Sequence, residues 1–178
     1  MLDSKEQSID YTLNSQYRKA CGEMKLKEIF NKFQLSSVTL STPIGDAEIQ
    51  FVTADEDAAW GLYIELITRT TIQPISDENG IELAILESVR SIFPTTRELL
   101  KEYGRKGQAF SKIAVIVLNQ VLRPFTTKWH KSAQNSLFED ATVAKEFRAE
   151  LAALQADLRH FTSMLAEIAR VDDISELI

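Results

Sequence analysis

Residues 123–131 bring cations, aromatic rings and a histidine together in nine consecutive positions, Arg-Pro-Phe-Thr-Thr-Lys-Trp-His-Lys. Guanidinium and ammonium groups bind phosphate oxygens, and aromatic faces stack on bases. A neutral histidine adds one hydrogen-bond donor and one acceptor. These residue types at this spacing are typical of a site that holds an anionic ligand, such as a nucleotide or a nucleic acid.

The distribution of charge along the chain favours the same interpretation. The 178 residues carry a formal net charge of −6. Residues 101–135 nevertheless hold seven Lys or Arg and one Glu, whereas 53–100 holds three basic and nine acidic residues. A local excess of positive charge in an acidic protein creates a field that attracts an anionic partner. We therefore expect the ligand to bind within 101–131.

Each residue type in this site has an expected role. The cations hold phosphates, Trp129 or Phe125 stacks on the ligand, and His130 orients it. The predicted ligand-binding residues are Arg69, Arg105, Lys106, Arg123, Lys128, Trp129, His130 and Lys131. In the alternative interpretation the cations form a solvated face, Trp129 belongs to the core, and Arg69 pairs with Glu65 one helical turn before it.

The sequence contains none of the common catalytic or metal-binding motifs. Walker A loops, Gly-x-Gly-x-x-Gly and His-Glu-x-x-His are all missing. The two histidines lie thirty residues apart, and the single cysteine, Cys21, allows no intramolecular disulfide. We expect a protein that is not an enzyme and needs no cofactor.

Apolar periodicity predicts a mainly α fold of five or six helices with one small β-hairpin, in a single domain over 1–178. A capping box of Thr53 and Glu56 is expected to open one helix, and Pro94 to end another. The predicted elements are a mostly helical segment over 5–33, the hairpin over about 37–52, helices over about 54–70 and 81–92, a short helix to Tyr103, a buried helix over 108–122 and a long helix over about 141–170.

The segment 108–122 is the most apolar part of the chain. Its β-branched residues at 113–118 are compatible with a buried strand, but the pattern continues beyond the length of a typical strand, which favours a helix. Pro124 is expected to kink this helix or to start a new one.

An apolar seam at spacings of three and four residues predicts the long C-terminal helix. This helix packs along its own domain or pairs with a partner helix. The second choice is a scaffold or assembly subunit, in which the seam docks on a protein partner or on a second copy. The seam consists of Val143, Phe147, Leu151, Leu154, Leu158, Phe161, Leu165 and Ile168.

The N-terminal residues are polar and lack the apolar core of a signal peptide. The longest apolar run, 113–118, has six residues, whereas a membrane-spanning helix needs about 20. We expect a soluble, cytoplasmic protein without membrane insertion.

Two segments, Asp-Ala-Ala-Trp-Gly-Leu-Tyr-Ile-Glu-Leu-Ile-Thr-Arg at 57–69 and Leu-Asn-Gln-Val-Leu-Arg-Pro-Phe-Thr-Thr-Lys-Trp-His at 118–130, resemble paired motifs of small helical modules in bacterial antiviral defence systems. With the residues between them, they cover about 40% of the chain. Such modules act as sensors or accessories of other effectors, and some recognise nucleotide signals. The resemblance implies a non-catalytic adaptor.

Overall fold

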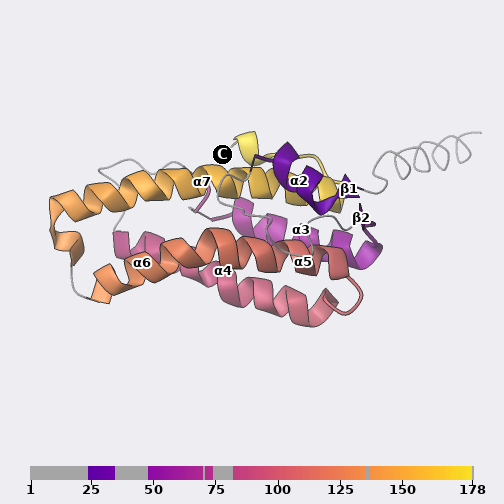
Figure 1. Cartoon of the computed structure of the whole chain (residues 1–178), viewed down its shortest axis with the longest axis horizontal. Coiled ribbons are helices and arrows are strands. Elements are labelled where there is room, and N and C mark those ends of the chain that lie inside the picture. The colour runs from indigo at the N-terminus through magenta and orange to yellow at the C-terminus, as the bar shows by residue number, and fades with distance from the viewer. Residues whose placement is uncertain (1–23, 35–47, 70, 74–81, 135–136, 178) are drawn as a thin grey trace, which may run out of the picture.

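The computed structural model describes residues 24–34, 48–69, 71–73, 82–134 and 137–177. Most of these residues are helical, so the predicted mainly α class is confirmed. Figure 1 shows the long helices lying side by side along the long axis of the molecule. The helices are α2 (Leu26–Lys32), α3 (Thr53–Ile67), α4 (Glu82–Tyr103), α5 (Gln108–Val117), the π-helical turn η1 (Leu118–Leu122), α6 (Arg123–Gln134) and α7 (Ala141–Ala169), with short 3₁₀ helices η2 (Leu137–Glu139) and η3 (Ser175–Leu177).

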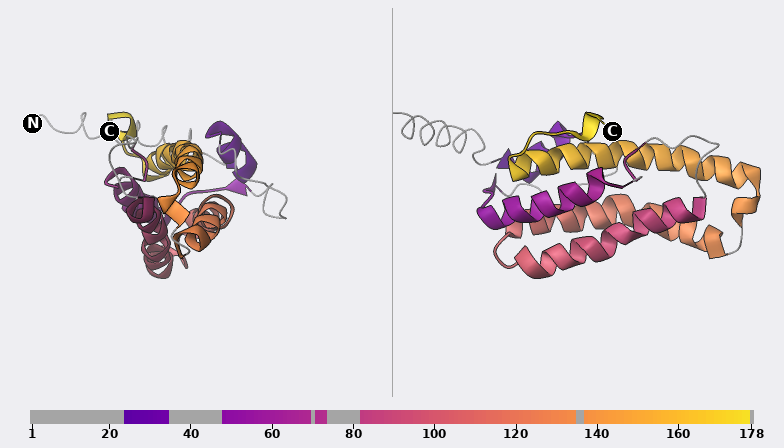
Figure 2. Two further views of the ribbon diagram at one scale, coloured as in Figure 1. Left: turned by 90° about the vertical axis from the view of Figure 1, so that its left-hand side faces the viewer. Right: turned by 180° about the vertical axis from the view of Figure 1, so that it is seen from behind.

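The apolar seam of α7 forms one side of the core. Seven of its eight residues, from Phe147 to Ile168, are buried, and Val143 packs against them. α7 lies against α3, and α3 lies against α4 and α5. The left view of Figure 2 looks along the bundle and shows the helices arranged around this shared interior. The seam is therefore used within the molecule.

The predicted capping box of α3 is wrong by one residue. Val52 occupies the N-cap, and the Asp55 carboxylate, not Glu56, reaches back to accept the backbone N–H of Val52 at 3.0 Å. Asp55 is 1% exposed and also accepts the backbone N–H of Phe110 at 2.8 Å. Asp55 takes the capping role expected of Glu56 because its carboxylate also accepts a hydrogen bond at the start of α5.

α4 runs through Pro94, which the sequence analysis wrongly expected to end a helix. Thr95 or Thr96 was the expected cap of the short helix to Tyr103, but neither starts a new helix, since their hydroxyls donate to the carbonyls of Ser91 and Ile92, one turn earlier. A proline inside a helix costs about 3 kcal/mol. Buried side chains on both sides of the proline, among them Ile92 and Thr96, offset that cost by packing on the same core.

The segment 108–134 is one helical path, which confirms the helix over the strand for 108–122. α5 continues through the π turn η1 into α6. Pro124 lacks an N–H, and its ring would crowd the carbonyl four residues earlier in a regular α-helix. The wider π turn directly before it opens the backbone at that place.

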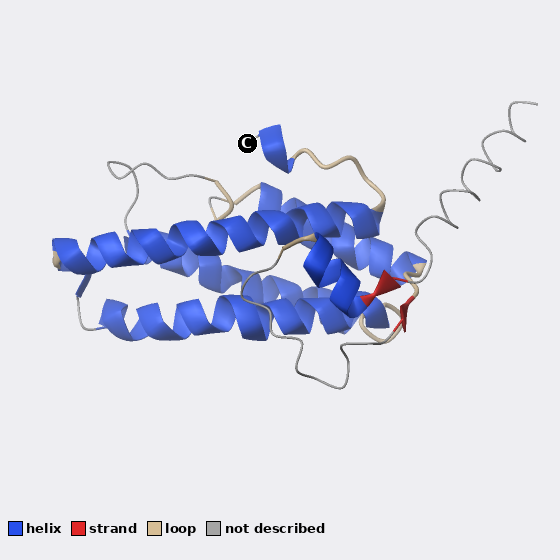
Figure 3. Cartoon of the chain, turned by 45° about the horizontal axis from the view of Figure 1, so that its top comes forward, coloured by secondary structure: helices blue, strands red, loops and turns tan. Residues whose placement is uncertain are grey.

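The predicted hairpin over 37–52 is not supported. The two-residue strand β2 (Glu48–Ile49) pairs antiparallel with β1 (Met24–Lys25), which precedes α2. The expected first strand, 38–41, and most of the expected helix over 5–33 lie outside the described residues. Figure 3 shows the two short strands at one end of the bundle. Alternation at 48–51 indicates an extended segment but does not identify its pairing partner.

Among the described residues, no helix combines the length and apolarity needed to cross a membrane.

Candidate anion-binding groove

The basic segment does not form one continuous surface. Arg105 and Lys106 lie in the turn that joins α4 to α5, whereas Lys128 and Lys131 lie on α6 (Figure 1). A helix rises about 1.5 Å per residue, so residues 108 and 128 are about 30 Å apart along this path. The predicted site is therefore divided between two ends of the bundle.

Trp129 is a core residue and does not offer a stacking face. Its side chain is 1% exposed, and its indole Nε1–H donates to Glu150 Oε2 at 2.9 Å. Its ring meets Phe147 edge-on at 5.2 Å between centroids and stacks on Phe138 at 6.0 Å. Phe125 is 8% exposed and joins the same cluster. These aromatic residues hold α6 against α7.

The charge of Lys128 is balanced within the protein. Its ammonium group donates to Glu146 at 2.7 Å and also pairs with Glu150, both on α7. Hydrogen bonds to Glu146 and then Glu150 raise the pKa of Lys128 above its ordinary value. The ammonium group also lies 4.7 Å from the centroid of the Trp129 ring. Lys128 thus serves the contact between α6 and α7.

Arg69 does not reach residues 123–131. Its guanidinium pairs with Glu65 and donates to the hydroxyls of Ser91 and Thr95 on α4. It therefore ties the end of α3 to the middle of α4, and the pairing with Glu65 follows the alternative interpretation of this residue.

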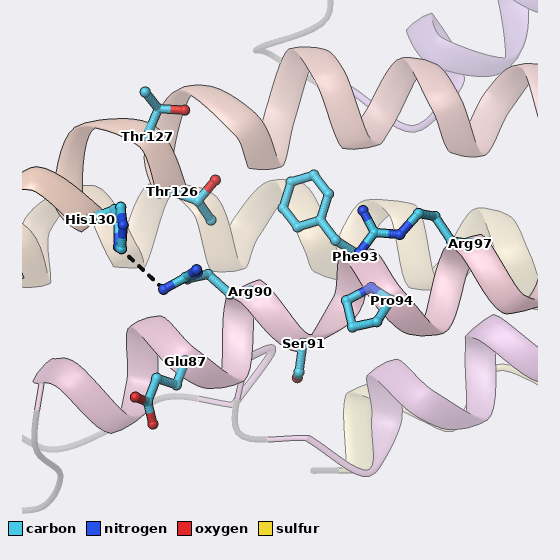
Figure 4. Close-up of a pocket in the computed structure, with 9 residues that line it drawn as sticks. All are labelled: Glu87, Arg90, Ser91, Phe93, Pro94, Arg97, Thr126, Thr127 and His130. Carbon is cyan, nitrogen blue, oxygen red and sulfur yellow. Dashed lines mark hydrogen bonds between the residues drawn. The ribbon is translucent and has the colours of Figure 1, made fainter.

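Of the remaining predicted residues, His130 lines a groove between α4 and α6, whereas the exposed Lys131 does not. The two helices run antiparallel in contact with each other (Figure 1). The groove has a volume of about 620 Å³. Figure 4 shows its lining: Glu87, Arg90, Ser91, Phe93, Pro94 and Arg97 from α4, with Thr126, Thr127 and His130 from α6.

One end of this α4–α6 groove is marked by a contact between Arg90 and His130. Arg90 Nη1 lies 3.2 Å from His130 Nδ1 (Figure 4). A guanidinium only donates, so Nδ1 is the acceptor and the imidazole carries its proton on Nε2. The Nε2–H is then the donor that His130 retains for a ligand.

At the other end of the groove, Arg97 is part of the lining and Arg123 lies beside it. Arg97 follows Arg90 by seven residues, and Arg123 precedes His130 by seven. Because the two helices are antiparallel, equal steps from the Arg90–His130 contact bring Arg97 and Arg123 to the same end. The Arg123 guanidinium lies 5.8 Å from the centroid of Phe93, one turn before Arg97. Asn119 accepts from Arg123 Nε at 2.9 Å and orients it.

The groove carries excess positive charge. Glu87 is the one carboxylate among its lining residues, and Figure 4 shows its carboxylate directed away from the Arg90–His130 contact. Within the described part of the chain, Arg90, Arg97 and Arg123 form no ion pair, whereas Lys32, Arg69, Lys128, Arg148 and Arg170 each do. Uncompensated guanidinium groups on one concave surface are suited to bind anions.

Sequence reasoning singled out Arg123 and His130 but missed Arg90 and Arg97, which lie in the acidic stretch 53–100. Their spacing of seven residues, two turns of a helix, was the available signal. This spacing indicates that Arg90 and Arg97 share one face of a helix, but it does not indicate that α6 packs against that face.

The chain matches no protein-family model, no curated protein and no solved structure. The function of the groove is therefore inferred from the residues that line it and from their charges. In the described ranges, no group of three or more His, Cys, Asp or Glu side chains forms a set of metal ligands.

Proposed function

We propose that this chain is a non-catalytic sensor or adaptor module that binds an anionic ligand, a nucleotide or nucleic acid, in the α4–α6 groove. The observation that carries the proposal is the gathering of Arg90, Arg97 and Arg123 around one groove without carboxylate partners among the described residues. His130 adds a hydrogen-bond donor from the second helix.

The chemistry of these groups fits phosphate. Guanidinium groups bind phosphate oxygens in pairs of parallel hydrogen bonds, and they remain charged at all physiological pH values. Half-buried Phe93 and exposed Pro94 add an apolar surface between the cations. A ligand with phosphates and an apolar or aromatic part would use both kinds of surface.

The two motifs that resemble modules of bacterial antiviral defence also support a sensing role. The second motif, 118–130, supplies the α6 side of the groove, with Thr126, Thr127 and His130 in the lining and Arg123 beside it. The first motif, 57–69, lies mostly on α3, which packs against α4. We propose on this basis that the module acts in a cytoplasmic defence response. No observation favours the scaffold alternative, because the apolar seam is buried in the core.

The test is a binding titration of the purified protein with nucleotides, cyclic oligonucleotides and single- and double-stranded nucleic acids at low and moderate salt. We expect saturable binding that weakens with salt as counterions are released. The double variant Arg97→Gln with Arg123→Gln should lose at least about tenfold in affinity, or about 1.4 kcal/mol.

Arg105→Gln is the matched control, since it removes one exposed cation from the far end of the bundle. Its affinity should equal that of the unaltered protein. Equal losses in the control and in the groove variant would show non-specific charge attraction and overturn the proposal. Failure to bind any ligand of the panel would do the same.

A further inference from the structure

The groove presents its cations in two groups separated along the helices. Arg90 and Arg97 are seven residues apart on α4, and Arg123 and His130 are seven apart on α6. Seven residues of helix span about 10 Å. Resting on the anion-binding function proposed above, we infer that the groove takes an elongated ligand with two anionic groups about this far apart, joined by an apolar or aromatic spacer.

The space between Arg90 and Arg97 on α4 is apolar on the α4 side, and the Arg123 guanidinium reaches it from α6, 5.8 Å from the centroid of Phe93. Phe93 and Pro94 of α4 line it, and Figure 4 shows them between Arg90 and Arg97 along the groove. A lone phosphate contacts one end and leaves the rest of the groove unused. A molecule with an anionic group at each end contacts both guanidinium groups of α4 and covers the apolar middle.

The two ends of the groove differ in how strongly they attract an anion. The Arg97–Arg123 end has two guanidinium groups and no carboxylate from the residues that line the groove. At the other end His130 Nδ1 is already in contact with Arg90, and Glu87 lies one turn from Arg90 on α4. The ligand's more highly charged group therefore binds beside Arg97, and the second group extends the contact toward Arg90.

A series of linear bisphosphonates tests this inference directly. The probes are alkane chains with a phosphonate at each end and spacers from shorter to longer than two helical turns. Alkyl monophosphonates of the same lengths are the matched controls. Calorimetry should show an affinity maximum at an intermediate spacer, with the best bisphosphonate at least about tenfold tighter than its monophosphonate.

Two variants assign the ends. Arg90→Gln should bring the best bisphosphonate down to about the affinity of the monophosphonate and weaken the monophosphonate much less than Arg97→Gln does. Arg97→Gln should weaken both probes. Because both side chains are exposed, the substitutions should keep the fold, which circular dichroism checks.

The outcomes separate this inference from the function on which it rests. If the two probes bind equally well at every length and Arg97→Gln weakens both, the groove is a single-anion site, and only the elongated ligand is excluded. If neither probe binds, the elongated-ligand inference is wrong, and the titration with nucleotides and nucleic acids decides the proposed function separately.

Discussion

Asp55, in the first turn of α3, accepts a hydrogen bond at 2.8 Å from the backbone N–H of Phe110, in the first turn of α5. Its other carboxylate oxygen accepts the backbone N–H of Val52 at 3.0 Å. One buried side chain thus satisfies N–H groups at two helix starts, which otherwise have no partner within their helices. The negative charge also suits the positive ends of both helix dipoles.

Replacement of Asp55 by Ala should therefore destabilise the protein more than loss of an ordinary cap. One cap contributes about 0.5–2 kcal/mol, and two buried N–H groups lose their acceptor here. We expect a loss of about 2–4 kcal/mol in urea unfolding. The matched control is Asp57→Ala, which removes an exposed carboxylate from the same turn and should change stability by less than about 0.5 kcal/mol. Equal losses in the two variants would contradict a shared cap.

Two glycines should respond differently to Ala. A Cβ at Gly107 would lie 2.9 Å from the carbonyl oxygen of Ala54, so the backbones of α3 and α5 would have to separate. A Cβ at Gly61 would lie 2.8 Å from Leu99 Cδ2, the end of a side chain that can rotate. In a helix interior, Ala also gains about 1 kcal/mol over Gly.

We expect Gly107→Ala to lose about 1–3 kcal/mol and Gly61→Ala to stay within about 0.5 kcal/mol of the unaltered protein in thermal unfolding. If Gly107→Ala leaves the stability unchanged, the backbones at the starts of α3 and α5 are not in close contact.

Trp129→Phe should affect stability but not ligand affinity. The change leaves a gap among the aromatic rings and removes the donor to Glu150, at a cost of about 1–3 kcal/mol. Trp60→Phe, at a position 46% exposed, is the control and should be nearly neutral. Urea unfolding and ligand titration of both variants are the measurements. A selective loss of affinity in a folded Trp129→Phe would restore the stacking role that the sequence analysis assigned to Trp129.

Acid should loosen the C-terminal segment through Asp173. Burial by itself raises the pKa of Asp173, but hydrogen bonds from Ser163, Ser175 and Tyr63 outweigh it and hold the pKa below its ordinary value of 3.8. A lowered pKa in the folded state means that the carboxylate stabilises the fold above pH 3.8 and loses this effect as pH falls through the folded-state value.

The comparison of Asp173→Asn with the unaltered protein measures this contribution. The variant should be less stable at neutral pH, and the difference should vanish in acid below the pKa of the folded state. Hydrogen exchange at Ile174, whose backbone N–H donates to Tyr63 at 2.9 Å, follows the segment itself. A difference that stays constant with pH would exclude the carboxylate charge as its cause.

The helices that sequence patterns predicted best are those with long apolar periodicity. The seam of α7 and the apolar stretch from Phe110 to Leu122 both indicate helices, and both lie in the core. Local stop and start signals were less informative at Pro94 and Thr53. At each place a tertiary contact outweighed a local preference: burial along α4 in the first case and the Asp55–Phe110 bond in the second.

The candidate site was only partly visible in the sequence, because charge was counted along the chain. A count of charges along the chain groups Arg105 with Arg123, although several turns of the continuous helix from α5 to α6 separate the two residues. It also left Arg90 and Arg97 in an acidic stretch. The antiparallel contact of α4 and α6 brings the arginines together, and only the tertiary arrangement contains that information.

The π turn η1 changes the rotation about the helix axis at which the side chains after it emerge. Nineteen residues separate Phe110 of α5 from Trp129 of α6, and both are buried. Five complete α-helical turns take about 18 residues, so a regular helix would rotate Trp129 out of line by about 100°. A π turn holds more residues than an α-helical turn, so η1 reduces this rotation, and both aromatic side chains are buried. Because His130 directly follows Trp129, the direction in which it meets Arg90 also depends on the π turn before Pro124.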